Sequence, residues 1–327
     1  DCMALSGILL NQILTIFIIL LIGVICYKVK LIDDETNKRL SDLLLYLVTP
    51  AVIFVSYQRD FSKELMEGLL FSLLFATIAH AVGISISYIL IRRKRRINNI
   101  ADGKRIKKTV YNENTEVERI ACAYANVGYM GIPLVNGIYG SEGVFYVTAY
   151  ITLFNLLIWT HGVMLMSGRK GLKFKEFAKM LLSPSIIAIL LGLICFSFQI
   201  KVPKIIYEAL NHVASLNTPL SMLVAGVTIA KTNILKALTR SMRLYYVIFI
   251  KLLLVPLVLM ALIIKFPVND MIKNIALIMS AAPTGATVIL FSIKYNKNSV
   301  LAVEIFTFAT LLCAVTIPLV VKIAELL

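Results

Sequence analysis

Apolar residues gather along the chain in ten long runs, separated by short polar or basic segments. About 20 apolar residues in a helix are enough to cross the ~30 Å hydrocarbon core of a bilayer, and each run has 18 to 26 residues. The pattern therefore predicts an all-α integral membrane protein with ten transmembrane helices. The predicted spans are residues 6–29, 38–57, 66–91, 118–138, 143–167, 183–200, 205–230, 243–265, 271–293 and 299–323.

Composition supports the membrane assignment. Hydrophobic residues make up 59% of the 327 residues and charged residues 16%, and the mean hydropathy is +0.86. A soluble domain of this size could not bury so much apolar surface. The first run has no basic segment before it and no small-residue cleavage site after it, so we expect a retained helix rather than a signal peptide.

Lys and Arg are unevenly distributed between the loops. The segments after odd-numbered runs hold 25 of them, those after even-numbered runs hold 7, and Lys251 lies inside a run. The positive-inside rule then places the basic loops in the cytoplasm and both termini outside the cell membrane. The run Arg92–Lys108 is accordingly expected to be a cytoplasmic loop that touches anionic lipid, and the net charge of +15 does not indicate nucleic-acid binding.

The two halves of the chain share sequence elements at a constant offset. A shift of 169 residues places LIGVIC (Leu21–Cys26) on LLGLIC (Leu190–Cys195) and LVTPAVIF (Leu47–Phe54) on LNTPLSML (Leu216–Leu223). Each half would contain five spans, and an odd number of spans forces the second copy to insert upside down. We predict an inverted repeat, as in many secondary transporters, with a first repeat over 1–167, a linker over 168–182 and a second repeat over 183–327.

Two spans carry residues that break helices. The fourth contains NVGYMGIPLVNGIYG (Asn126–Gly140) and the ninth contains SAAPTGATVILFSIKYN (Ser280–Asn296). Proline removes a backbone N–H and glycine leaves helical geometry at little cost. In lipid, the released backbone groups need protein, water or ligand as partners. Two broken helices meeting in a cavity would present helix N-termini that suit an anion.

These two stretches also resemble sequence elements of a known protein family. NVGYMGIPLVNGIYG resembles the Asn-x-Gly-x-x-Gly-x-Pro element of the auxin efflux carrier family, which includes bacterial dicarboxylate carriers and the plant PIN-formed auxin transporters. AAPTGATVILFSIKYN is similar to the ninth helix of that family, and LVTPAVIF also matches. The resemblance implies a scaffold domain and a transport domain, helices 4 and 9 crossing beside the substrate, and transport of small organic anions.

The chain departs from the plant members at two points, so the resemblance favours a bacterial-type carrier. Val288 stands where plant members tend to have a second crossing proline, and the segment Gly168–Leu182 has no room for a long regulatory insert. The break segments and the Thr-Pro elements supply the expected substrate-binding residues. They are Asn126, Gly128, Gly131, Pro133, Pro283, Thr284, Gly285, Thr287, Thr49, Pro50 and Thr218.

Few ionisable residues lie inside the spans, and such residues are candidates for function. Lys251 lies about eight residues into its span, roughly 12 Å at 1.5 Å per residue. It either snorkels to the surface or acts as a fixed cation where related folds bind sodium. Glu304 is a second charge-compensating candidate or a partly hydrated surface carboxylate. His80 and His161 relay protons or remain neutral and hydrogen-bonded.

Three classes of function compete for a membrane protein of this kind. A carrier for carboxylates such as malate, malonate or auxin-like acids explains the repeat and the paired breaks. An intramembrane enzyme is disfavoured because the spans contain no HExxH or GxSxG motif, and a ligand-sensing receptor or scaffold with the carrier fold stays open. The five cysteines show no metal-binding or disulfide spacing, so neither metal nor cofactor is expected. The substrate, the coupling ion, the direction of transport and the oligomeric state, homodimer included, are left open.

Overall fold

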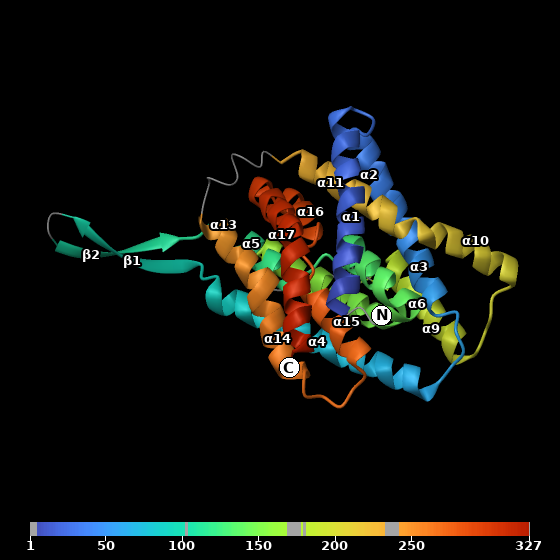
Figure 1. Ribbon diagram of the computed structural model, residues 1–327. Coiled ribbons are helices and arrows are strands. Elements are labelled where there is room, and N and C mark those ends of the chain that lie inside the picture. Colours follow the sequence, from blue (N-terminus) through green and yellow to red (C-terminus); the bar gives the residue numbers. More distant parts are fainter. Residues whose placement is uncertain (1–4, 102–103, 169–177, 179–180, 233–241, 327) are drawn as a thin grey trace.

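The computed structural model describes residues 5–101, 104–168, 178, 181–232 and 242–326. It consists of a bundle of helices from which a two-stranded hairpin projects on one side (Figure 1). The predicted linker, 168–182, lies mostly outside the described residues, and so does Cys2.

Three long apolar segments open the chain. Ser62 caps the third of them, because its hydroxyl accepts a hydrogen bond from the N–H of Leu65 at 3.1 Å. The helices of the first half are α1 Leu5–Lys28, α2 Asp34–Leu43, η1 Leu44–Val48, α3 Thr49–Ser56, α4 Lys63–Leu90, α5 Thr115–Ala123, η2 Val127–Gly131, α6 Ile132–Leu157, η3 Ile158–Gly162 and α7 Val163–Ser167, where η marks a π-helical turn.

The second half also begins and ends with capped helices. Ser183 caps α9 by accepting from the N–H of Ile186 at 3.4 Å, and Asn298 caps α17 by accepting from Leu301 at 3.0 Å. The helices of this half are α9 Pro184–Ser197, α10 Lys204–Ser215, α11 Asn217–Ala230, α13 Met242–Phe249, η4 Ile250–Leu254, α14 Val255–Ile263, α15 Asp270–Ala281, α16 Thr287–Lys294 and α17 Ser299–Glu325.

Seven helical segments of the described chain are long and apolar enough to cross a membrane. They are Gly7–Lys28, Asp34–Ser56, Lys63–Leu90, Val127–Ser167, Lys204–Ala230, Met242–Ile263 and Ser299–Glu325. Three differences separate this number from the ten predicted spans. The fourth and fifth spans share one continuous element after α5, the sixth is the 14-residue helix α9, and the ninth is divided into α15 and α16.

A glycine marks the turn between the predicted fourth and fifth spans. Gly140 has φ 60° and ψ −153° inside α6, where the surrounding residues are helical. A side chain would be strained at this positive φ, and a Cβ at Gly140 would meet no described atom within 4 Å. Backbone conformation, rather than lack of space, therefore requires glycine here.

The basic segment after α4 forms a hairpin, although the sequence pattern indicates only a loop. β1 Lys94–Ala101 and β2 Lys104–Tyr111 pair antiparallel, with Lys94 opposite Tyr111 and Ala101 opposite Lys104. The strands contain few apolar residues, so their sequence lacks the alternation that would have predicted them. The hairpin extends away from the helices, beside the ends of α4 and α13 (Figure 1).

The first helix shows how the bundle meets its surroundings. On α1, Ile13 and Leu20 are buried, whereas Ile18 and Ile25 are 60% and 58% exposed. Both faces of the helix are apolar, as expected of a helix that packs against protein on one side and lipid on the other. The buried face packs on α11 so closely that a Cβ on Gly226 would lie 2.1 Å from the Leu20 oxygen.

Candidate functional site

The two broken helices are joined to each other by main-chain hydrogen bonds. Ala125 and Thr284 form an isolated antiparallel bridge between the break after α5 and the break after α15. The N–H of Asn126 donates to the oxygen of Pro283 at 2.7 Å, and the N–H of Gly285 donates to the oxygen of Tyr124 at 3.2 Å. Backbone groups that the helix breaks release thus become partners across the crossing, which removes the cost of leaving them unpaired.

Local sequence explains why the second break fits against the first. Pro283 has no N–H and cannot continue α15. A Cβ on Gly285 would lie 2.9 Å from the oxygen of Ala125, so only glycine allows this approach. The hydroxyl of Thr284, which is fully buried, donates to the oxygen of Ala121 at 2.9 Å near the end of α5. Val288, where plant members tend to have proline, lies inside α16, and the break is complete without it.

The residues of the first break begin the next helix. The side chain of Asn126 accepts a hydrogen bond from the N–H of Tyr129 at 3.3 Å and so caps η2. Gly131 packs against α15, because a Cβ there would lie 2.7 Å from Cε of Met279. At Gly128 a Cβ would meet no described atom within 4 Å. One side of the crossing is therefore open at Gly128.

Pro133 and Thr287 lie one turn or less into the helices that follow the breaks. Pro133 is buried at the start of α6, and its oxygen accepts from Nε2 of Gln12 on α1 at 3.5 Å. Thr287 is half-buried at the first position of α16. The eight residues expected at the two breaks thus lie in, or within one turn of, the two segments that meet at the crossing, and their binding of substrate stays a prediction.

Lys251 is attached to the end of α15. Its side chain is 1% exposed, and Nζ donates to the oxygen of Ser280 at 2.9 Å. This carbonyl belongs to the last turn of α15, whose oxygens lack partners within the helix and carry the negative end of the helix dipole. The ammonium does not reach the surface, so of the two sequence interpretations the structure favours a fixed cation beside the crossing.

His80 lies on α4 beside the other broken helix. Nδ1 is 2.8 Å from the oxygen of Ala76, which can only accept, so Nδ1 carries the hydrogen and Nε2 is an acceptor. Nε2 is buried and has no described partner. The imidazole stacks near Tyr150, with ring centroids 4.6 Å apart, and lies 6.1 Å from the ring of Tyr124. His80 is therefore a buried acceptor next to the crossing.

Tyr124 is a crossing residue that the sequence reasoning missed. Its hydroxyl lies 2.9 Å from Nδ1 of His161, and the other ring nitrogen of His161 lies 3.1 Å from the hydroxyl of Tyr88. A tyrosine directly after Ala123 in an apolar run gives no signal of this contact, because the partners come from α4 and η3. The network connects the crossing to His161, the second histidine that the sequence singled out.

Glu304 lies elsewhere. It is 7% exposed and lines a cavity of about 150 Å³ with Glu118 in the first turn of α5 and Arg243 in the first turn of α13, and it lies itself in the second turn of α17. Arg243 donates to both carboxylate oxygens of Glu118, at 2.5 and 2.6 Å. Glu304 is thus buried beside a cavity that it shares with charged groups, and Glu118 is a buried acid that the sequence analysis did not select.

The Thr-Pro elements form a separate contact. Nδ2 of Asn217 donates to the hydroxyl of Thr49 at 3.4 Å, which joins the start of α3 to the start of α11. Pro50 and Thr218 are half-buried beside this contact. Helix α11 packs against η2, but no described hydrogen bond connects Thr49, Pro50 or Thr218 with the residues of the crossing.

Comparison with known proteins gives the same assignment as the motifs. A family described as membrane transport protein matches residues 8–176 and again 172–321, nearly the whole chain. An uncharacterised transporter of Methanocaldococcus jannaschii is 23% identical over 321 residues, covering 93% of this chain and 96% of the relative. One of Methanothermobacter thermautotrophicus is 26% identical over 222 residues, covering 67% of each. The resemblance to the auxin efflux carriers is confirmed, and the chain belongs to this family of membrane transport proteins.

Proposed function

We propose that the chain is a secondary carrier that moves small organic anions across the membrane by alternating access at the crossing of α5–η2 with α15–α16. Family membership assigns transport, and the substrate class is our inference. Carboxylates such as malate, malonate or auxin-like acids belong to this proposed substrate class. The observation that carries the proposal is a buried ammonium, Lys251, fixed beside two broken helices that are bonded to each other.

The charge of the site favours an anion. No described carboxylate lies within salt-bridge distance of Lys251, and a buried charge without a counter-ion is costly. An anionic substrate would supply that counter-ion when it reaches the crossing. The open side at Gly128 provides a place for it, and Asn126 and Thr287 provide neutral polar groups at the same level.

Reciprocal packing supports two inverted repeats of five spans each, residues 1–167 and 183–327. A Cβ on Gly23 of α1 would lie 2.5 Å from the oxygen of Leu223 on α11. A Cβ on Gly192 of α9 would lie 2.5 Å from the ring of Tyr57, which ends α3. At the offset of 169, Gly23 corresponds to Gly192 and α3 to α11. Each half thus packs its glycine against the Thr-Pro helix of the other half, as a two-fold relation requires.

The ten-span topology follows from these repeats. In it, α5 with η2 and the start of α6 form the fourth span, α9 forms the sixth, and α15 with α16 forms the ninth. An even number of spans places both termini on one side, and the distribution of Lys and Arg places that side outside the cell membrane.

Counterflow in proteoliposomes tests the proposal. Purified protein is reconstituted with an unlabelled carboxylate inside, and uptake of labelled malate or malonate is measured for the wild type and for Asn126→Ala. Asn211→Ala, an exposed asparagine on α10, is the matched control. We expect counterflow by the wild type and the control, and at least a tenfold loss in Asn126→Ala.

Two other results would reject parts of the proposal. Wild-type counterflow in Asn126→Ala would remove the crossing from the transport path. Saturable binding of a carboxylate, seen as a thermal shift, without counterflow would instead favour the receptor that the sequence analysis left open.

A further inference from the structure

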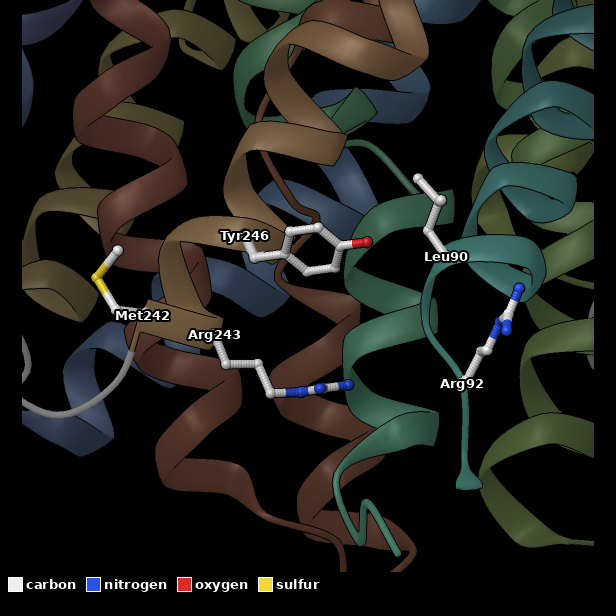
Figure 2. A pocket seen from close by; sticks show the side chains of 5 residues that line it. All are labelled: Leu90, Arg92, Met242, Arg243 and Tyr246. Atoms are coloured by element: carbon white, nitrogen blue, oxygen red, sulfur yellow. The ribbon is translucent and has the colours of Figure 1, made fainter. Parts of the chain in front are cut away.

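A groove opens between the end of α4 and the beginning of α13, away from the crossing. Its volume is about 530 Å³, and it is lined by Leu90, Arg92, Met242, Arg243 and Tyr246. Figure 2 shows Arg243 and Tyr246 extending from α13 toward the side that carries Leu90, the last residue of α4, and Arg92, which follows it. Nothing in the transport mechanism proposed above uses this groove.

One wall of the groove is an apolar surface of a membrane-spanning helix. Met242, Tyr246 and Phe249 are spaced four and three residues apart, so they share one face of α13, and they are 84%, 41% and 54% exposed. Exposed apolar side chains on a transmembrane helix face the acyl chains of lipids. The groove is therefore open to the bilayer.

The basic groups lie at the level where the spans leave the hydrocarbon. Arg92 comes two residues after the end of α4, and Arg243 is the second residue of α13. Tyr246 lies about one turn deeper, where an amphipathic ring meets the interface. The groove thus has guanidinium groups at headgroup depth and apolar groups below them.

The charge of the groove is positive. None of the described residues that line it is acidic. Glu118, behind the wall, neutralises Arg243 through two hydrogen bonds, which leaves Arg92 as the lining charge with no acidic partner in the described part of the chain. Arg93 next to it is also exposed, and the hairpin strands that follow carry seven further Lys or Arg in their sequence.

We propose that this groove is a binding site for one anionic phospholipid of the adjacent leaflet. The phosphate lies at Arg92, the lining charge that Glu118 does not balance, and an acyl chain runs along Leu90 and Tyr246 toward Phe249. Basic pockets between transmembrane helices bind acidic headgroups, and each Lys or Arg near the membrane surface contributes about 1 kcal/mol. That contribution corresponds to roughly a fivefold change in affinity.

The chain contains a comparison groove of similar size at the end of α1. It has a volume of about 680 Å³ and is lined by Tyr27, Lys28, Lys30, Ile32, Asp33, Asp34 and Glu35. Its lining has two lysines and three acidic residues, of which Asp34 is paired with Lys231, so the described lining has no excess of positive charge to attract an anionic lipid. A lysine from this groove therefore serves as a control for Arg92.

The test uses the full chain in detergent and measures binding of dioleoyl phosphatidylglycerol or dioleoyl phosphatidylcholine by native mass spectrometry, together with the melting temperature. The variants are Arg92→Gln, Met242→Glu and, as control, Lys30→Gln. Arg92, Lys30 and Met242 are exposed, so no substitution disturbs the core.

We expect phosphatidylglycerol to bind more tightly than phosphatidylcholine. Arg92→Gln should lower the affinity for phosphatidylglycerol about fivefold. Met242→Glu should lower this affinity at least as much, because its carboxylate repels the phosphate, and Lys30→Gln should leave the affinity unchanged. Equal binding of the two lipids, an unchanged affinity in Arg92→Gln, an equal loss in Lys30→Gln, or equal stabilisation by free sodium phosphate would each overturn the proposal. None of these results depends on whether the protein transports carboxylates.

Discussion

The ammonium of Lys251 donates a hydrogen bond to the carbonyl of Ser280 at 2.9 Å, within the last turn of the broken helix α15. A cation at the C-terminal end of a helix interacts favourably with its dipole, and burial strengthens that interaction. The contact ties the η4 turn of one span to the break in another. It therefore links the only buried lysine of the described chain to the geometry of the crossing.

Replacing Lys251 tests that link. Lys251→Ala removes the ammonium that balances an incoming anion, so transport should fall at least tenfold while the protein still inserts. Lys251→Arg should rescue poorly, since a planar guanidinium does not replace a compact ammonium at a single carbonyl. Initial uptake rates, normalised to protein in the membrane, give the readout, with Lys265→Ala at an exposed position as control. Near-wild-type uptake rates in both Lys251 variants would show that Lys251 has no role in transport.

An added methyl group should lower the stability of the protein at one glycine of the crossing and leave the stability unchanged at another. In Gly285→Ala the Cβ would lie 2.9 Å from a backbone oxygen that cannot move away, so we expect a loss of about 1–3 kcal/mol of stability. Gly128→Ala meets open space and should keep the wild-type melting temperature. If the substrate occupies that space, Gly128→Ala should weaken carboxylate binding. Thermal melts with and without ligand measure both effects, and equal melting temperatures for the two variants would contradict the geometry.

Loss of Arg243 and loss of Glu118 should lower the stability of the protein by different amounts, although the two residues form one ion pair. Glu118 is 1% exposed, whereas the side chain of Arg243 is 35% exposed. Arg243→Gln leaves a buried carboxylate without its cation, which costs about 3–5 kcal/mol, while Glu118→Gln leaves a guanidinium that water can reach. The melting temperature in detergent should therefore fall more in Arg243→Gln than in Glu118→Gln, and the double variant should recover part of the loss. A larger loss in Glu118→Gln would show that Arg243 depends on the pair.

Orientation is tested by labelling. A cysteine in place of Lys104, on the basic hairpin, should react only with reagents that reach the cytoplasmic side. A cysteine in place of Lys265, the last residue of the eighth predicted span and two residues after the end of α14, should react only from outside. The labelling pattern of intact cells and inverted vesicles decides, and reaction of Lys104→Cys from outside would reverse the proposed topology.

The positions of the helix breaks could be read from the sequence because their causes are local. Proline and glycine act through their own backbone, so the segments around Pro133 and Pro283 indicated that the helices of the fourth and ninth spans are interrupted. The pairing of Ala125 with Thr284 could not be predicted. It depends on how two segments distant in the chain approach each other, and neither residue carries a signal of its own.

The position of Lys251 inside its span could also be predicted from the sequence, but the direction in which its side chain points could not. Eight residues into a span, a lysine can reach either the surface or a neighbouring helix, and only the place of Ser280 decides between them. Glu304 illustrates the same limit. Its sequence position left contact with water and charge compensation both open, and only the packing of α17 against α5 and α13 shows that it lies beside Glu118 and Arg243.

Beside the hydrogen bond from the Thr284 hydroxyl, two hydrogen bonds across the crossing connect main-chain atoms, from Asn126 to Pro283 and from Gly285 to Tyr124. Exchanging the side chain of Tyr124, Ala125 or Asn126 leaves these bonds in place. Evolution, or an engineer, can therefore alter what the site recognises while the joint between the broken helices is inherited unchanged.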